Sequence, residues 1–282
     1  MKQAAERERG RAAETPAVDQ PPGRPAARPQ PVPWSLIVQP EGRPGSEQMA
    51  TDAALLAAAR DGTAFLRLYR WSPGCLSFGR NEPALERYDR SRIQALGLDT
   101  VRRPTGGRAV WHEAEVTYTV AGPDGLFGSL PQTYHAIHAM IAEGLRGLGV
   151  PANLANRSTA QPLNRLTAGA CFASPAGGEV MVRGAKLVGS AQVREHGAFL
   201  QHGSILLEDG QDLVARVTRG TPPPVAATSL VAVLGRGVTF AEVAAAIAGA
   251  ARRTWAGHWQ ESVPPNLADR GQFADPAWTW RR

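Results

Sequence analysis

The segment GAKLVGSAQ (residues 184–192) carries a lysine, Lys186, in a chain whose other cations are almost all arginines. Of the 31 lysines and arginines in the sequence, only Lys186 and Lys2 are lysines. An arginine stays charged, whereas the pKa of a lysine can be moved and its ammonium can give up a proton. Lys186 is therefore a candidate for proton transfer, and a surface lysine left over in an arginine-rich composition is the alternative interpretation.

A second segment, RRPTGGRAVWH (residues 102–112), surrounds a pair of glycines with cations. Paired glycines let a backbone approach a ligand closely and expose its N–H groups. A plain hairpin turn between two strands is the alternative. The candidate ligand-binding residues of this segment are Arg103, Thr105, Gly106, Gly107, Arg108 and His112.

Two further segments supply a thiol and a cluster of small and polar residues. GACFASP (residues 169–175) contains Cys171, which is either a nucleophile or a packed core thiol. GAFLQHGSILL (residues 197–207) places a Gln-His-Gly-Ser run where the chain is expected to cross the core. Such residues are either outward-facing strand positions or part of a site. Together with GAKLVGSAQ, this run gives the candidates Gly189, Ser190, Gln192, His202 and Gly203.

Helices and strands alternate along the chain without strict βαβ order. This pattern predicts an α+β fold in which a mixed, largely antiparallel sheet is flanked by helices. The first predicted helix has Ser46 as its N-cap and Gly62 as its stop signal. The other predicted helices span residues 83–97, 130–149 and 239–257, the predicted strands are 64–71, 75–79, a segment around Val101 and 109–120, and an antiparallel meander is predicted for 170–207.

Composition divides the chain into three parts. Residues 1–33 are rich in proline, alanine and charge and predict a disordered tail, residues 34–260 predict one catalytic domain, and residues 261–282 predict an irregular C-terminal segment. The N-terminus has no apolar stretch typical of a secretory signal, and no apolar run reaches the ~20 residues that span a bilayer. We therefore expect a cytoplasmic protein that does not insert into membranes, in which Cys75 packs in the core.

The four motifs occur in an order that resembles the biotin/lipoate protein ligase catalytic-domain superfamily. RRPTGGRAVWH, ACFASP, GAKLVGSAQ and LQHGSILL carry the resemblance, and MATDAALL and WSPGCLSFGRNEP resemble the opening helix and second strand of that family. ATP-dependent lipoate ligases typically have a third glycine where this chain has Arg108, and they lack a cysteine at the position of Cys171. The chain is thus most similar to the cysteine-dependent octanoyltransferase branch.

The resemblance implies a reaction and roles for the candidate residues. Cys171 would attack the thioester of octanoyl-acyl carrier protein and then pass the octanoyl group to a lysine of a lipoyl-accepting protein, such as the glycine-cleavage H protein. Lys186 would lower the pKa of Cys171 and transfer protons. The other candidates would line or brace the substrate site, and no cofactor or metal is implied, because the acyl group arrives activated.

Three other functions stay open from the sequence. An amidotransferase of the same branch would move octanoyl between lipoyl domains, and an ATP-dependent ligase would use free lipoate. A non-catalytic binding module, for nucleic acid or protein, is compatible with the formal net charge of +6. Against nucleic acid, the arginines are scattered and do not alternate with aromatic residues. We therefore expect acidic protein partners rather than nucleic acid.

Overall fold

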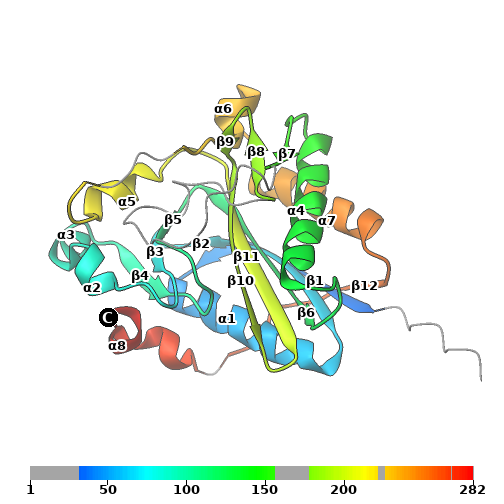
Figure 1. The fold of residues 1–282 in the computed structure, drawn as a ribbon, viewed down its shortest axis with the longest axis horizontal. Helices are drawn as coiled ribbons and strands as arrows, with labels where there is room; N and C mark the ends of the chain where they lie inside the picture. The colour runs from blue at the N-terminus through cyan, green and yellow to red at the C-terminus, as the bar shows by residue number, and fades with distance from the viewer. Residues whose placement is uncertain (1–31, 156–177, 222–225, 268, 282) are drawn as a thin grey trace, which may run out of the picture. The chain divides into compact units, whose positions relative to one another are not determined.

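The computed structural model describes residues 32–155, 178–221, 226–267 and 269–281. Its centre is a mixed sheet in which β1 pairs in parallel with two strands and all other neighbours are antiparallel. This arrangement confirms the predicted α+β fold (Figure 1). In sheet order, the six strands are β10 (Val188–Glu195), β11 (Ala198–Leu206), β6 (Glu115–Pro123), β2 (Ala64–Trp71), β1 (Pro33–Arg43) and β12 (His258–Glu261).

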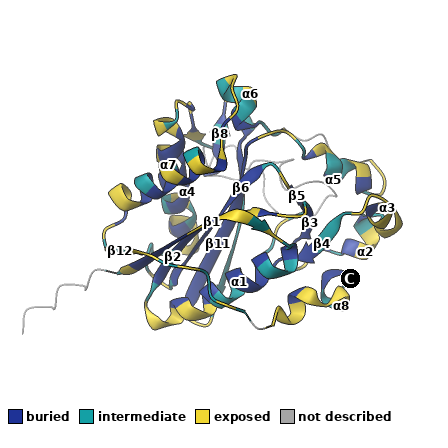
Figure 2. Cartoon of the chain, turned by 180° about the vertical axis from the view of Figure 1, so that it is seen from behind, coloured by how far each residue is buried: buried dark blue, intermediate teal, exposed yellow. Residues whose placement is uncertain are grey.

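Helices cover both faces of this sheet, and its strands are largely buried (Figure 2). Helix α1 (Gly45–Ala58) packs on one face, and α4 (Leu130–Gly147) and α7 (Phe240–Thr254) pack on the other (Figure 1). Because side chains alternate along a strand, β2 sends Leu66 and Leu68 into the α4–α7 core. Its intervening residue, Arg67, reaches the α1 face and bonds to Asp52 there.

The two helices predicted from clear apolar periodicity are confirmed. In α4, Ile137, Ile141 and Leu145 are fully buried along one face. Helix α7 begins after Thr239, whose side chain accepts a hydrogen bond from the backbone of Glu242. The Glu242 side chain in turn accepts a hydrogen bond from the Thr239 backbone N–H and so completes a capping box.

Two smaller sheets flank the large one. The first contains β4 (Asp99–Arg102), β3 (Cys75–Phe78) and β5 (Val110–His112), and the second contains β7 (Asn153–Leu154), β8 (Val180–Val182) and β9 (Ala185–Lys186). The prediction of one strand over residues 109–120 is wrong, because β5 pairs with β3 while β6 belongs to the large sheet. The hairpin alternative for the glycine turn is also wrong, since β3 lies between β4 and β5.

The helix start predicted at Ser46 is wrong. Helix α1 begins at Gly45 after Pro44, and Ser46 lies inside its first turn without capping it. The reason is a long-range contact: the Gly45 N–H donates to Asp99 Oδ2 at 3.0 Å, so a carboxylate from another element satisfies this first donor. The predicted stop is confirmed, because a 3₁₀ turn, η1 (Ala59–Asp61), ends at Gly62 in the left-handed conformation.

The helix predicted over residues 83–97 is interrupted at Tyr88. Two short helices, α2 (Ala84–Arg87) and α3 (Arg90–Ala95), flank an extended residue there. Tyr88 forms a β-bridge with Thr218 and donates its hydroxyl to Glu82 at 2.6 Å. These tertiary bonds compensate for the lost helical ones, and the Asp89 side chain caps α3.

Within its described part, the predicted antiparallel pairing is confirmed, but as two hairpins and not as one meander, because β8 and β9 belong to a small sheet and β10 and β11 to the large one. Tight turns join β8 to β9 and β10 to β11, and both contain residues with positive φ: Arg183 and Gly184 in the first, His196 and Gly197 in the second. The connections after β11 carry α5 (Asp212–Val217) and α6 (Leu230–Leu234). None of the helices in the described residues is both long and apolar enough to cross a bilayer.

The C-terminal segment packs against the small β4–β3–β5 sheet. It contains a 3₁₀ turn, η3 (Gly271–Ala274), and α8 (Pro276–Thr279). Arg102, fully buried on β4, donates hydrogen bonds to the carbonyls of Trp278, Thr279 and Arg281. One guanidinium therefore anchors the end of the chain beside the glycine turn.

Candidate functional site

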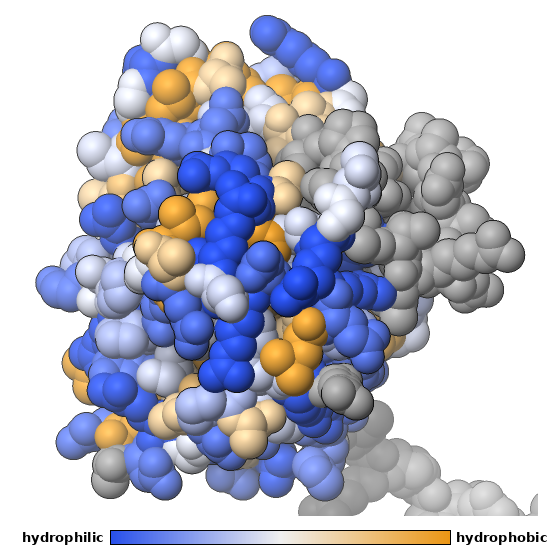
Figure 3. Space-filling view, turned by 90° about the vertical axis from the view of Figure 1, so that its left-hand side faces the viewer, coloured by the Kyte–Doolittle hydropathy of each residue, from blue (hydrophilic) through white to orange (hydrophobic). Residues whose placement is uncertain are grey.

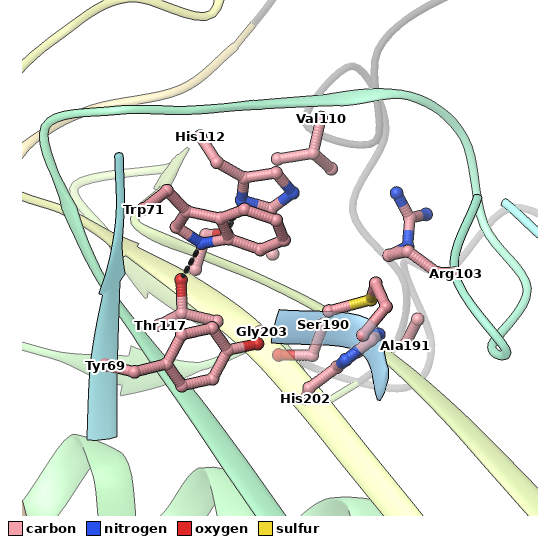
Figure 4. A pocket seen from close by; sticks show the side chains of 13 residues that line it. Tyr69, Trp71, Arg103, Val110, His112, Thr117, Ser190, Ala191, His202 and Gly203 are labelled. Carbon is pink, nitrogen blue, oxygen red and sulfur yellow. Dashed lines mark hydrogen bonds between the residues drawn. The ribbon is translucent and has the colours of Figure 1, made fainter. Parts of the chain in front are cut away.

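A pocket lies where the α1 face of the large sheet meets the β4–β3–β5 sheet (Figure 4). Its empty space is about 310 Å³, counting the part that opens to solvent. Six residues predicted as site residues line it: Arg103, His112, Gly189, Ser190, His202 and Gly203. The remaining lining residues are Met49, Tyr69, Trp71, Val110, Thr117, Ala191 and Ser204. RRPTGGRAVWH thus converges on one cavity with two neighbouring motifs that lie far from it in the sequence.

Arg103 holds the glycine turn in shape. Its guanidinium donates through Nη2 to the carbonyls of Gly106 and Arg108, at 3.1 and 2.8 Å. Through Nη1 it donates to the backbone and side-chain oxygens of Ser77, at 2.9 and 2.6 Å. The arginine is nearly fully buried, so these bonds fix the turn relative to β3. Gly107 packs so closely on Gly79 that a Cβ at Gly79 would overlap it.

Thr105, at the start of the turn, is tied to the large sheet through a histidine. Its hydroxyl lies 2.7 Å from His202 Nε2, and His202 Nδ1 lies 2.9 Å from Asp52 Oδ2. Asp52 is fully buried on α1 and also accepts bonds from Arg67 at 2.7 Å and Thr119 at 2.9 Å. A hydroxyl–imidazole–carboxylate chain therefore connects the turn with β11 and α1.

The charges in this chain follow from burial and contact. Burial alone would raise the pKa of Asp52, but the bond from His202 and the charge of Arg67 outweigh it and lower that pKa. Burial lowers the pKa of His202 although Asp52 opposes the shift. The imidazole is therefore neutral at neutral pH, with its proton on Nδ1 facing the carboxylate. Nε2 is then an acceptor, and the Thr105 hydroxyl donates to it.

A second chain of the same kind braces the other side of the pocket. His112 Nδ1 lies 2.8 Å from Glu115 Oε1, and His112 Nε2 lies 2.6 Å from the Ser77 hydroxyl. Ser204 donates to the same Glu115 oxygen at 2.9 Å. The His112 ring stacks on Trp71 with centroids 4.1 Å apart, which fixes the imidazole plane.

Ser190 is held from the α4 side of the sheet. Its hydroxyl lies 2.8 Å from His138 Nε2 and 2.7 Å from the Tyr118 hydroxyl, and His138 Nδ1 lies 2.7 Å from the Gly178 carbonyl. Burial lowers the pKa of His138 to about 4 against the bond to Gly178, and the charge of Lys186 adds to the shift. Because a carbonyl only accepts, Nδ1 carries the proton of His138 and the Ser190 hydroxyl donates to Nε2.

Lys186 lies on β9, with only 2% of its side chain exposed. Its Nζ is 2.6 Å from Glu179 Oε1, and this carboxylate is also buried. Backbone bonds to Ala226 and Thr228 fix the residue on both sides. The lysine is thus not a surface residue, and that alternative interpretation is wrong.

The other predicted positions are less central or are not described. Gln192 is half-buried on β10 and donates to Gln201 at 3.2 Å, and Arg108 contributes its carbonyl to the Arg103 contact. Cys171 lies outside the described residues. Cys75 is fully buried in an apolar cluster, as predicted, and burial raises the pKa of its thiol.

Sequence reasoning missed the groups that orient the predicted residues, chiefly Asp52, Glu115, His138 and Glu179. Asp52 occurs in MATDAALL, where an acidic residue among apolar helix positions was the available signal. His138 and Glu179 gave no such signal, because their partners are distant in the sequence. Within the described residues, no cluster of three or more His, Cys, Asp or Glu side chains is arranged to hold a metal ion.

The family of the chain follows from comparison with known proteins. The model of the lipoyl protein ligase A/B catalytic domain matches residues 44–252, which is most of the chain. This chain belongs to the lipoyl protein ligase A/B catalytic domain family. The resemblance predicted from the four motifs is confirmed.

Relatives within this family include octanoyltransferases. The chain is 42% identical to octanoyltransferase LipM of Kyrpidia tusciae over 193 residues, which cover 66% of this chain and 70% of that protein. It is 38% identical to octanoyltransferase LipM of Symbiobacterium thermophilum over 232 residues, which cover 76% and 84% of the two chains.

Solved structures share the lipoyl protein ligase fold. A lipoate-protein ligase A bound with ATP superposes with a TM-score of 0.67 at 19% identity, covering 87% of this chain and 94% of that one. A bipartite lipoate protein ligase from Thermoplasma acidophilum also gives a TM-score of 0.67, at 17% identity, covering 89% and 96%. At these identities the similarity defines the fold and not the reaction.

Proposed function

We propose that this chain is an octanoyltransferase of protein lipoylation. It takes an octanoyl group from octanoyl-acyl carrier protein, holds it as a thioester on Cys171, and passes it to a lysine of a lipoyl-accepting protein such as the glycine-cleavage H protein. The observation that carries the proposal is the convergence of three motifs on one pocket in a chain 42% identical to an octanoyltransferase.

The reaction consists of two acyl transfers. The Cys171 thiolate attacks the thioester carbon of the donor, the bond to the donor sulfur breaks, and that sulfur leaves with its electron pair and takes a proton. The amine of the acceptor lysine then attacks the new thioester, and a C–N bond replaces the C–S bond. The amine loses one proton and the Cys171 sulfur leaves as a thiolate. No ATP is consumed, because each step exchanges an already activated acyl group.

Lys186 supplies the cation and the proton that this chemistry needs. A free thiol has a pKa of about 8.5, and a nearby ammonium favours the thiolate. Glu179, which pairs with Lys186 at 2.6 Å, keeps the ammonium oriented within a buried site. Lys186 lies 15 positions after Cys171 in the sequence, and Glu179 lies between them.

The charge of the surface supports acidic protein partners. The face over α2, α3 and α5 is mostly hydrophilic (Figure 3). The exposed charged residues of these elements are Arg90, Arg92 and Arg216 together with Glu86 and Asp212, which leaves a small excess of cations. Arginines in water steer an acidic carrier or lipoyl domain toward the protein more than they tighten the complex.

Intact-mass measurement after mixing the protein with octanoyl-acyl carrier protein tests the proposal. We expect the mass of one octanoyl group to be added to the wild-type chain and to be absent from Cys171→Ala. Cys75→Ala is the matched control and should still form the adduct, because its thiol is sealed in the core. An adduct that persists in Cys171→Ala, or none in the wild type, would contradict the proposal.

Two further comparisons separate donors and define the role of the lysine. Octanoyl-lipoyl domain, or free octanoate with ATP, should not replace octanoyl-acyl carrier protein as the donor. Lys186→Arg keeps a positive charge but exchanges protons poorly. We expect it to form the adduct and to transfer the acyl group slowly, and full transfer activity in this variant would refute the proton-transfer role.

A further inference from the structure

The polar groups around the pocket direct their protons away from it, toward two buried carboxylates. On the α1 side, Asp52 accepts the Tyr69 hydroxyl at 3.1 Å and His202 Nδ1–H at 2.9 Å. Both donors belong to residues that line the pocket. Asp52 is fully buried, so its oxygens face these donors and not solvent.

Glu115 accepts the hydrogen bonds on the other side of the pocket. It accepts from His112 Nδ1 at 2.8 Å, from the Ser204 hydroxyl at 2.9 Å and from the Thr117 hydroxyl. The indole N–H of Trp71 in turn donates to Thr117 Oγ1 at 2.7 Å (Figure 4). Glu115 has 1% of its surface exposed, so it is shielded from solvent beneath the pocket.

The remaining lining groups are occupied in the same way. The Ser190 hydroxyl donates a hydrogen bond to His138. Nη1 of Arg103 donates to Ser77, and Nη2 donates to the glycine turn. Among the residues described around the pocket, each hydroxyl, indole N–H and imidazole N–H is therefore donated inside the protein. The hydroxyl-bearing side chains and the aromatic rings of the pocket consequently present carbon, ring faces and lone pairs to its contents.

We propose that Asp52 and Glu115 determine the acyl-chain specificity of the enzyme by withholding these protons from the pocket. The pocket then accepts an unsubstituted alkyl chain and rejects a chain whose distal end carries a hydrogen-bond acceptor. The inference rests on the proposed function, in which this pocket holds the octanoyl chain. Both carboxylates are positioning residues, since they act through the side chains that contact the substrate.

The selectivity has a direct physical cause. A carbonyl oxygen transferred from water onto side chains that donate no hydrogen bond to it loses its hydrogen bonds, whereas a methylene group gains from the transfer. The apolar wall is made by Met49, Val110 and the Trp71 ring stacked on His112. The three hydrogen bonds to Glu115 all end on Oε1, and its buried Oε2 has no hydrogen-bond partner. A leucine at this position removes the acceptor of all three donors, so that their protons can turn toward the pocket.

Calorimetric titration of the full-length wild-type chain with two unreactive amides tests the proposal. Octanamide should bind, and 7-oxooctanamide, which differs by one distal carbonyl, should bind about 10- to 100-fold more weakly. Equal affinities, tighter binding of the oxo compound, or no binding of octanamide would overturn the proposal. The amides form no thioester, so this result is separate from whether an octanoyl adduct forms on Cys171.

A matched pair of variants assigns the effect to the buried carboxylate. Glu115→Leu should reduce the preference for octanamide about fivefold or more, since the protons that Oε1 accepted become available to the carbonyl. Glu113→Leu changes an exposed carboxylate two positions away and should leave the preference unchanged. An unchanged preference in Glu115→Leu, or an equal reduction in both variants, would overturn the role of Glu115.

The ring nitrogens give a readout that does not depend on any variant. Nitrogen-15 chemical shifts of the wild-type protein at neutral pH should identify His112 and His202 as Nδ1-protonated tautomers, because each Nδ1 faces a carboxylate. Nε2-protonated, neutral rings would mean that the protons are not withheld, and would overturn the proposal even if Glu115→Leu does not fold.

Discussion

The buried imidazole of His138 should make the stability of the protein depend on pH in a calculable way. Its pKa is about 4 in the folded chain, against an ordinary value of 6.5. Between these values the unfolded state binds a proton that the folded state does not, so the free energy of unfolding falls as the pH falls. For this one group, the loss is about 2 kcal/mol between pH 7 and pH 5.

Urea denaturation of wild type and His138→Gln at several pH values isolates this contribution. His202, whose pKa is also lowered by burial, acts in the same direction, but it is present in both proteins and cancels in the difference. The glutamine can still accept the Ser190 proton and has no titration of its own. We expect the stability curve of the variant to be flatter than that of wild type by about 1 kcal/mol per pH unit near pH 5.5.

Parallel curves would refute the reasoning, because they would mean that His138 titrates alike in both states. A uniform loss of stability at all pH values would indicate a packing role alone. Direct titration of the His138 ring by NMR provides the second check. An apparent pKa near 6.5 in the folded protein would contradict the neutral imidazole and its bond from Ser190.

Three other perturbations have defined outcomes. Asp52→Asn removes the carboxylate that neutralises the fully buried Arg67 and should lower the free energy of unfolding, measured by urea denaturation, by about 3–5 kcal/mol. A loss below about 1 kcal/mol would contradict this role of Asp52. Gly203→Ala places a Cβ 2.6 Å from a carbonyl oxygen and should cost about 1–3 kcal/mol, whereas Gly106→Ala, with no atom within 4 Å of its Cβ, should be neutral. Arg102→Leu removes the anchor of the C-terminal segment, so limited proteolysis should cut that segment much faster than in wild type.

The sequence alone determined the elements whose signals are local. The apolar spacing of α4 and α7, the β-forming run of β2 and the stop at Gly62 are properties of neighbouring residues, and each was predicted in the right place. The motifs also identified the family and six residues of the pocket. Those residues are polar or small within strand-like sequence, where the core would otherwise require apolar side chains.

Only the tertiary structure decided how these residues are held and charged. Asp99 satisfies the start of α1, and Asp52, Glu115 and Glu179 meet partners whose positions depend on strand register and helix packing. Side-chain periodicity indicates which face a residue occupies, but not which residue lies opposite it. Because hydrogen bonds act over about 3 Å, proton positions and pKa shifts follow from the packed arrangement rather than from the order of residues.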